Sequence, residues 1–200
     1  MRAMAEPAPT TSPLVRRYDI EEFWALEPPP EGGKWELIAG VLYMVPPPSV
    51  RHACVVSQLN RFLVQFTLAS SQVARVFVPS AAVWTRRPAT WLEPDLFMVS
   101  GERVVAAAEA GFASAELVVE VASPSTTLYD RTTKADTYAA LGVRELWLVD
   151  SESRTIERRV LEGRTWRPAE RFTEGDVVES EAFPGLRLRV GDVFADLRDS

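Results

Sequence analysis

Apolar and polar residues follow one another along this chain in patterns that predict both strands and helices. Two short, mostly apolar runs, Trp35–Ile38 and Val41–Val45, flank Ala39-Gly40 and predict a β-hairpin. After Ser49, a suitable N-cap, apolar residues recur at spacings of three and four as far as about Ala69. The first part of the chain is therefore expected to form a hairpin followed by a long helix with one apolar face.

Beyond this helix we expect further strands, a second long helix and C-terminal hairpins. The second helix is predicted from about Asp130 to Leu141, with Gly142 as its C-cap, and a short last helix is predicted to begin at Asp192. Strands are predicted over residues 73–78, 82–86, 95–99, 116–122 and 144–150, hairpins over 154–190, and a loop over 88–94. This mixture predicts an α/β or α+β fold in one domain over residues 18–200. Residues 1–17, with a start rich in Pro, Ala and Thr, are predicted to be disordered.

The composition excludes several kinds of chemistry. The 200 residues carry a net charge of −6 and contain one histidine, His52, and one cysteine, Cys54. A zinc centre needs about three or four Cys or His ligands, and a disulfide within the chain needs two cysteines. No apolar run has the roughly 18 residues of a membrane span. The ionisable groups that remain are mainly carboxylates and arginines, which favours oxygen-ligated metal chemistry, and a cytoplasmic location is expected.

Two carboxylates lie where the apolar pattern predicts burial. Asp95 begins the strand Asp-Leu-Phe-Met-Val, and Glu120 lies inside Glu-Leu-Val-Val-Glu-Val-Ala, on the face of Val118 and Ala122. A lone buried carboxylate costs several kcal/mol, roughly, unless it is paired, protonated or bound to a metal. The alternative is that both residues lie at strand ends and contact solvent.

A lysine follows these carboxylates on the second predicted helix. Asp130, Lys134 and Tyr138 are spaced four residues apart and share one face of it. The chain contains twenty arginines and only two lysines, so Lys134 is conspicuous, whereas Lys34 is expected to be a hairpin-edge residue. Either this face presents an ammonium group to the two carboxylates, or Asp130 and Lys134 form an ordinary exposed pair.

These segments, taken in order, resemble a known family. Pro94-Asp95, then the run Val118-Val119-Glu120-Val121-Ala122-Ser123-Pro124-Ser125, then Asp130, Lys134 and Tyr138, then Gly142–Asp150, are similar to the Uma family of restriction-endonuclease-like proteins. That bacterial family lies within the PD-(D/E)XK nuclease superfamily. The segment Trp35–Gly40 and His52 also match, so that the resemblance covers about residues 18–165.

The resemblance implies a restriction-endonuclease-like core, in which helices flank a central mixed β-sheet, here with extra β-hairpins. Asp95 and Glu120 would be the catalytic, metal-binding carboxylates and Lys134 the catalytic amine. One departure concerns the superfamily's Glu-x-Lys pattern, because its lysine position is Ala122 here. Asp130 and Tyr138 would support the site. Glu36 is expected to be an accessory acid or an exposed hairpin charge, and His52 either an accessory residue or a surface histidine.

The function implied is metal-dependent hydrolysis of phosphodiester bonds in DNA. Mg²⁺ or Mn²⁺ would be held by Asp95, Glu120 and the Val121 carbonyl. The alternatives are a weak or inactive member of the fold that binds nucleic acid or protein, and a hydrolase of another phosphate ester. Arg158 and Arg159 are candidates for DNA binding, although a solvated ribbon with cross-strand ion pairs explains them as well. A homodimer is compatible with cutting both strands of a duplex, and no membrane partner is expected.

Overall fold

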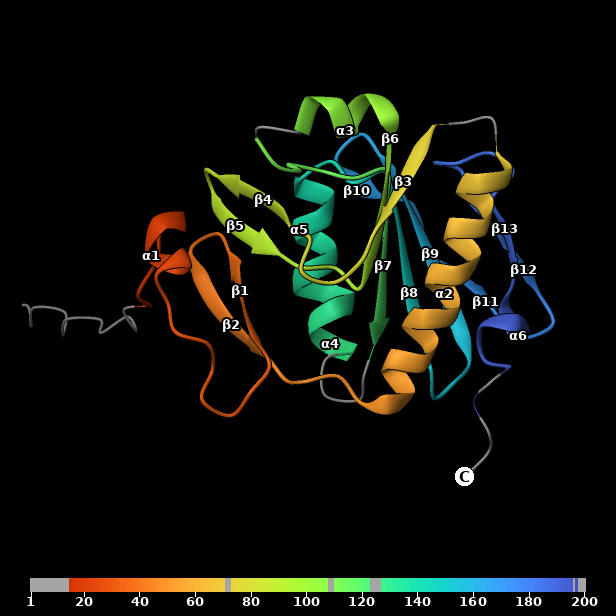
Figure 1. Ribbon diagram of the computed structural model, residues 1–200, viewed down its shortest axis with the longest axis horizontal. Coiled ribbons are helices and arrows are strands. Elements are labelled where there is room, and N and C mark those ends of the chain that lie inside the picture. The colour runs from red at the N-terminus through yellow and green to blue at the C-terminus, as the bar shows by residue number, and fades with distance from the viewer. Residues whose placement is uncertain (1–14, 71–72, 108–109, 123–126, 196, 198–200) are drawn as a thin grey trace, which may run out of the picture.

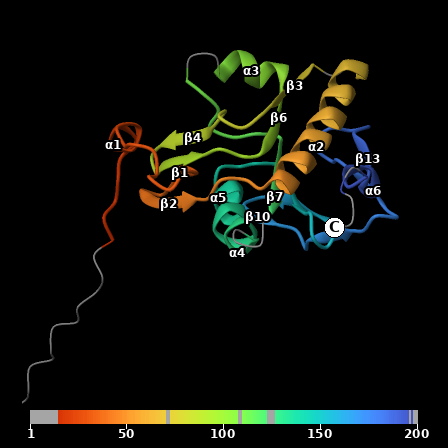
Figure 2. The same cartoon turned by 60° about the horizontal axis from the view of Figure 1, so that its bottom comes forward.

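The computed structural model describes residues 15–70, 73–107, 110–122, 127–195 and 197. Figure 1 shows a large central sheet with α2 on one side, and with the helical segment α4 to α5 and a smaller sheet on the other. Figure 2 shows the same arrangement from a second direction. This architecture confirms the predicted mixed fold, in which helices flank a central sheet with added hairpins.

The large sheet has seven strands in the order β10-β9-β8-β7-β6-β3, and β11 also pairs with β9. Only β7 and β8 run parallel, and the other pairs are antiparallel. The two strands at its centre, β7 and β8, are buried almost throughout, which explains their nearly continuous apolar sequence. The strands are β3 (Ala74–Phe77), β6 (Leu96–Ser100), β7 (Leu117–Ala122), β8 (Glu145–Asp150), β9 (Thr155–Glu162), β10 (Thr165–Trp166) and β11 (Glu170–Phe172).

The smaller sheet contains the predicted hairpin and one strand that the sequence did not reveal. Residues 88–94 were expected to form a loop, but Ala89–Leu92 form β5, which pairs with β4 and touches β1 at Leu37. The segment is only four residues long and begins just after Pro88, which favours a turn or loop. In the structure its side chains nevertheless alternate between partly buried and buried, as in a strand. The order is β2-β1-β5-β4, with β1 (Lys34–Ile38), β2 (Val41–Val45) and β4 (Val83–Arg86). A separate pair joins β12 (Val177–Glu179) to β13 (Arg187–Arg189).

The long helix α2 (Val50–Ala69) confirms the prediction from Ser49, whose side chain accepts a hydrogen bond from the His52 N–H. The second predicted helix is made of three consecutive helical segments, α4 (Thr127–Tyr129), the π-helical turn η1 (Asp130–Lys134) and α5 (Ala135–Ala140). Gly142 follows with a φ of 75°, as expected of a C-cap glycine. The remaining helices are α1 (Ile20–Trp24), α3 (Gly101–Ala107) and α6 (Val190–Val193).

Two apolar cores lie on opposite faces of the large sheet. One contains Leu59 and Leu63 of α2, the buried Val119 of β7, and residues of the C-terminal hairpin. The other contains Val118 of β7 and Tyr138 of α5, together with residues of the small sheet. Because successive side chains of a strand point to opposite faces, Glu120 lies on the same face as Val118 and Tyr138. The fold thus directs one buried carboxylate toward α5.

Candidate active site

The two strand carboxylates lie where β6 and β7 stop pairing. The ladder between these strands runs from Met98–Leu117 to Leu96–Val119. The next residue of each strand is Asp95 and Glu120. Beyond the ladder, the Asp95 side chain replaces the missing strand partner, because its Oδ2 accepts a 2.8 Å hydrogen bond from the Val121 N–H. The structure therefore brings the two predicted carboxylates to the same break in the sheet.

His52 lies against Asp95 from the first turn of α2. Its Nε2 is 3.0 Å from Asp95 Oδ1, and both side chains are 16% exposed. Burial alone would lower the pKa of His52, but the hydrogen bond and charge of Asp95, the charge of Glu120 and a hydrogen bond to the Val121 backbone raise it. Burial would raise the pKa of Asp95, but His52, Lys134 and the Val121 N–H lower it. His52 is thus a member of the cluster and not a surface histidine.

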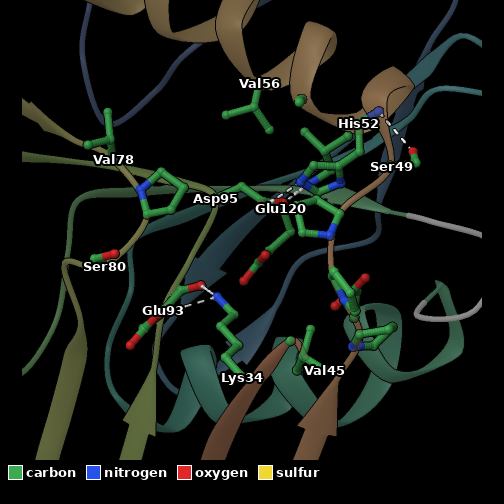
Figure 3. Close-up of a pocket in the computed structure, with 18 of the residues that line it drawn as sticks. Lys34, Val45, Ser49, His52, Val56, Val78, Ser80, Glu93, Asp95 and Glu120 are labelled. Atoms are coloured by element: carbon green, nitrogen blue, oxygen red, sulfur yellow. Dashed lines mark hydrogen bonds and ion pairs between the residues drawn. The ribbon is translucent and has the colours of Figure 1, made fainter. Parts of the chain in front are cut away.

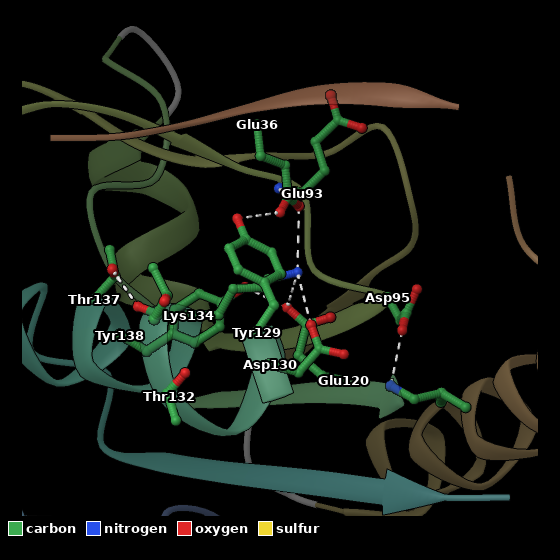
Figure 4. Close-up of polar contacts among 12 residues, drawn as sticks. Glu36, Glu93, Asp95, Glu120, Tyr129, Asp130, Thr132, Lys134, Thr137 and Tyr138 are labelled. Atoms are coloured by element: carbon green, nitrogen blue, oxygen red, sulfur yellow. Dashed lines mark hydrogen bonds and ion pairs between the residues drawn. The ribbon is translucent and has the colours of Figure 1, made fainter. Parts of the chain in front are cut away.

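Lys134 joins Glu120 to a third carboxylate, Glu36 of β1. Its Nζ lies 2.7 Å from Glu120 Oε1, 3.2 Å from Glu36 Oε1 and 3.9 Å from Asp130 Oδ1. Figure 4 shows this convergence from three parts of the fold. The Lys134 side chain is 4% exposed and that of Glu36 is 0% exposed, so neither the exposed-pair interpretation of Lys134 nor the exposed-charge interpretation of Glu36 applies.

The π-helical turn of η1 lies directly before this contact. A single turn of π-helix within an α-helix shifts the side chains that follow it and is frequent at functional sites. Lys134 ends η1, and α5 begins at the next residue. Asp130, Lys134 and Tyr138 are all buried, which confirms the face predicted from their spacing. The sequence did not predict the π-helical turn, because spacing and caps that predict an α-helix do not distinguish it from a π-helix.

Two tyrosines complete the buried polar cluster. Tyr138 donates its hydroxyl hydrogen to Glu120 Oε1 over 2.5 Å, and Tyr129 donates to Glu36 Oε2 over 3.0 Å. The Lys134 ammonium also lies 5.8 Å from the centre of the Tyr129 ring. Tyr138 was a predicted accessory residue, whereas Tyr129 was not. The only available signal for Tyr129 was its position next to Asp130, since its partner Glu36 is 93 residues away in the chain.

Three carboxylates around one ammonium determine the protonation of the cluster. Burial is the largest cause that raises the pKa of Glu120 to about 8; Lys134 opposes it, and the charges of Asp95, Asp130 and Glu36 reinforce it. Burial lowers the pKa of Lys134, but Glu120 and Glu36 raise it well above its usual value. Burial and the neighbouring charges therefore favour the protonated form of Glu120 and the charged form of Lys134.

A cleft of about 800 Å³ opens onto these groups. Figure 3 shows Asp95, Glu120 and His52 along it, with Lys34 and Glu93 on the side of the small sheet. Pro46-Pro47-Pro48 and the first two turns of α2 contribute to its lining. Lys34 and Glu93 were not predicted as site residues. A substrate can therefore reach the two strand carboxylates through this cleft.

Comparison with known proteins assigns the chain to a family. Residues 20–191 match the model of the Uma2 family, described as "Putative restriction endonuclease". The chain belongs to the Uma2 family. A solved structure described as "a putative nuclease belonging to DUF820 from Anabaena variabilis ATCC 29413" is similar in fold, with a TM-score of 0.73 and 19% identity over 89% of this chain and 98% of that one. No curated protein matches the chain.

The motif of this Uma2 chain is only partly covered by the structure. Ser123, Pro124 and Ser125, and the first 14 residues of the predicted N-terminal segment, lie outside the described residues. Within the described ranges, no helix is long and apolar enough to cross a membrane. The three predicted catalytic residues, Asp95, Glu120 and Lys134, all lie within the described residues.

The donor set of this Uma2 site fits Mg²⁺ or Mn²⁺. Among the described residues, no three His, Cys, Asp or Glu side chains are arranged as a ready-made metal centre. Mg²⁺ does not need one, because it is commonly held by one or two carboxylates together with water and substrate phosphate. Asp95 and Glu120 provide that pair at the wall of the cleft. The Val121 N–H already binds Asp95, and a role for the Val121 carbonyl as a metal ligand stays a prediction.

Arg158 and Arg159, the predicted DNA-binding pair, are occupied by contacts within the protein. Arg158 donates to both carboxylate oxygens of Glu170 at 2.9 and 3.0 Å, and Arg159 lies 2.6 Å from Glu157. Their side chains are 11% and 17% exposed. The Arg158–Glu170 pair joins β9 to β11, as the alternative of cross-strand ion pairs predicts, whereas the Arg159–Glu157 pair lies within β9. Neither arginine lines the cleft, and contact with DNA stays a prediction for both.

The raised pKa of Glu120 predicts how stability depends on pH. Between about pH 4.5 and 8 the folded chain holds a proton on Glu120 that the unfolded chain has lost, so the free energy of unfolding falls as pH rises. His52, whose pKa is also raised, adds to this fall above its ordinary value. We expect Glu120→Gln to remove about 2–5 kcal/mol of this pH dependence. Thermal unfolding in EDTA from pH 5 to 8.5 measures it, and parallel curves for variant and wild type would contradict the assignment.

Proposed function

We propose that this Uma2-family protein is a metal-dependent nuclease that hydrolyses phosphodiester bonds of DNA. The observation that carries the proposal is the convergence of Asp95, Glu120 and Lys134 at one break in the sheet, within a cleft that a substrate can enter. The family description and the nuclease-like fold support the same reaction class.

Each side chain has a distinct part in this proposal. Asp95 and Glu120 would hold a divalent ion, which would supply a Lewis acid for the phosphodiester and a more acidic water. Lys134 presents an ammonium group beside Glu120, where it stabilises negative charge that develops on the phosphate. A well-placed donor of this kind contributes about 3–4 kcal/mol to the transition state. Asp95 is held for this task by the Val121 N–H and by His52.

Glu36, Asp130, Tyr129 and Tyr138 position these groups. Glu36 accepts hydrogen bonds from Lys134 and Tyr129, and therefore fixes the ammonium between β1 and η1. Tyr138 holds Glu120 from the helix side. Glu36, Asp130 and Tyr138 are buried and Tyr129 is partly buried, so the cluster limits the access of water to the amine and strengthens its electrostatic effect.

The second candidate is a member of the fold that binds a ligand without hydrolysing it. It is favoured by the net charge of −6, which opposes binding of a polyanion, and by the internal pairing of Arg158 and Arg159. A metal-binding measurement separates the candidates, because an inactive module does not need an ion between Asp95 and Glu120.

Addition of Mn²⁺ is expected to raise the melting temperature by about 5 °C at a concentration a hundredfold above its Kd, since an ion that binds only the folded state stabilises it. The rise should disappear in Asp95→Ala. The matched control is Glu145→Gln, which alters a buried carboxylate of β8 that receives hydrogen bonds from Trp147, Ser180 and Ala182. An equal rise in Asp95→Ala would place the ion elsewhere.

The activity itself is tested with a panel of single-stranded and duplex DNA, RNA and small phosphate esters in Mg²⁺ and in Mn²⁺. Cleavage of DNA that stops in EDTA and in Glu120→Ala is the expected result. Cleavage of small esters alone would show another phosphate-ester hydrolase. Absence of cleavage across the panel would contradict the proposed function.

A further inference from the structure

Both lysines of the chain lie in the same cleft. Twenty other basic positions carry arginine, yet Lys34 and Lys134, 100 residues apart, line one cavity and share one partner. Glu36 Oε1 lies 3.2 Å from Lys134 Nζ and 3.7 Å from Lys34 Nζ. Lys34 was expected to be a hairpin-edge residue, but its side chain also lines the cleft and contacts Glu36. The structure raises the question of what a second amine does at this site.

Lys34 differs from Lys134 in its access to solvent. Its side chain is 31% exposed, compared with 4% for Lys134. Its Nζ donates a 2.7 Å hydrogen bond to the Glu93 carbonyl oxygen and lies 3.7 Å from Glu93 Oε2. An ammonium group has three N–H donors, and the carbonyl bond uses one of them. Lys34 is therefore a held but accessible cation, whereas Lys134 is enclosed by its carboxylates.

The backbone before Lys34 fixes this placement. Gly33 has a φ of 86°, and a Cβ added there would lie 2.1 Å from the Val45 carbonyl oxygen of β2. Only glycine permits this close approach and this conformation together. The start of β1 is thus pressed against the end of β2, and Figure 3 shows the Lys34 side chain extending from it toward Glu93 in the cleft.

We propose that Lys34 binds a second phosphate of the substrate, the one next to the phosphate that is hydrolysed. This inference rests on the proposed function and deepens it, because it makes the substrate a nucleotide strand with at least two consecutive phosphates and not a small phosphate ester. Lys34 and Asp95 line the same cleft, and the Glu93 carbonyl that holds Lys34 precedes Asp95 by only two residues. A strand that places one phosphate at Asp95 can therefore present a neighbouring phosphate to Lys34. Lysine serves such contacts as a mobile point charge.

A purely structural role would leave Lys34 as a neutralising partner of Glu36 and Glu93. The two roles differ in one measurable respect, because only a phosphate contact couples Lys34 to one phosphate of the ligand. Neutral methylphosphonate groups remove the charge of single phosphates, and therefore allow a double-mutant cycle between the protein and the strand.

The experiment measures binding of a fluorescent single-stranded DNA hexamer in Ca²⁺, with a methylphosphonate placed at each position in turn. Lys34→Ala is expected to weaken binding of the unmodified hexamer about tenfold and to reduce the slope of log K against log salt by about 0.7. In the wild type, one methylphosphonate position should weaken binding by a similar factor, and in Lys34→Ala that position should have no effect. Lys34→Arg, which keeps the charge, should restore most of the affinity and the dependence on that position.

The control is Arg187→Ala, which removes one positive charge from the exposed end of β13, where Arg187 pairs with Glu179. It should leave affinity and the methylphosphonate pattern unchanged. The phosphate assignment would be overturned if every methylphosphonate position weakened binding equally in wild type and Lys34→Ala. It would also be overturned if Lys34→Ala bound the unmodified hexamer with wild-type affinity. Cleavage is scored separately in Mg²⁺. Coupling without cleavage would refute the proposed nuclease and keep the phosphate site, whereas cleavage without coupling would do the reverse.

Discussion

Replacement of Glu120 by glutamine is expected to lower the rate of phosphodiester hydrolysis by at least about a thousandfold while the protein stays folded. The amide cannot supply the charge that holds a divalent ion beside Asp95. It does resemble the protonated carboxyl that burial favours here, since burial and three neighbouring carboxylates raise the pKa of Glu120 to about 8. The Tyr138 hydroxyl can still donate to the amide oxygen. We therefore expect a melting temperature at pH 7.5 equal to or above that of the wild type in EDTA.

The measurement combines hydrolysis rates in Mn²⁺ with thermal unfolding of the same preparations. Glu145→Gln serves as the control, because Glu145 is fully buried but lies outside the cleft. It should lose stability and keep the wild-type specific activity of the folded fraction. A Glu120→Gln protein with more than a tenth of the wild-type activity would remove Glu120 from the metal site.

Replacement of Lys134 by methionine is expected to reduce both activity and stability. The loss of a donor beside the reacting phosphate should lower the rate about 10²–10³-fold. Lys134 is the lysine that contacts Glu36, Glu120 and Asp130 together, so its loss removes the central cation from three buried carboxylates, which should cost about 3–5 kcal/mol of folding free energy. Urea unfolding and hydrolysis of the same samples measure the two effects.

A variant in the partner separates these two effects. Glu36→Gln in the Lys134→Met background removes one of the buried negative charges that lost its contact with Lys134, so it should recover part of the stability. It should not recover activity, because the amine is still absent. Recovery of hydrolysis together with stability would show that Lys134 acts only through folding. Wild-type stability in Lys134→Met alone would contradict the buried ion cluster.

Local patterns in the sequence were sufficient to predict much of the fold. The hairpin around Gly40, helix α2 from Ser49 and the strands β6, β7 and β8 each follow from spacing, caps and apolar runs that act over a few residues. The same local reasoning placed Asp130, Lys134 and Tyr138 on one buried face. It failed for β5. Its pairing with β4 is a local hairpin across Arg87-Pro88, where the proline favoured a loop, and its pairing with β1 joins residues distant in the chain.

The predicted site residues converge, but their partners were only partly predictable. Asp95 and Glu120 were conspicuous because carboxylates interrupt apolar strands. Lys34 and Tyr129 were not, because each owes its place to Glu36 or Glu93, which tertiary packing brings near them. The pairing of Arg158 with Glu170 likewise depends on the register of β9 against β11. Arg159 pairs with Glu157 within β9, but its bond to the Arg131 carbonyl depends on the packing of η1 against β9. Sequence patterns therefore identified the main chemical groups of the site. The packing of the small sheet against the large one determined which side chains contact them.

The most direct test of metal-dependent cleavage at Asp95 and Glu120 is to add a divalent ion to metal-free wild-type protein and to follow cleavage of labelled DNA in single turnover. We expect no cleavage in EDTA, and cleavage that appears with added Mn²⁺ in proportion to the fraction of protein that the ion stabilises against heat. Cleavage that persists without any divalent ion, or full Mn²⁺ occupancy of the Asp95–Glu120 site with no cleavage of any DNA substrate, would contradict the proposed function.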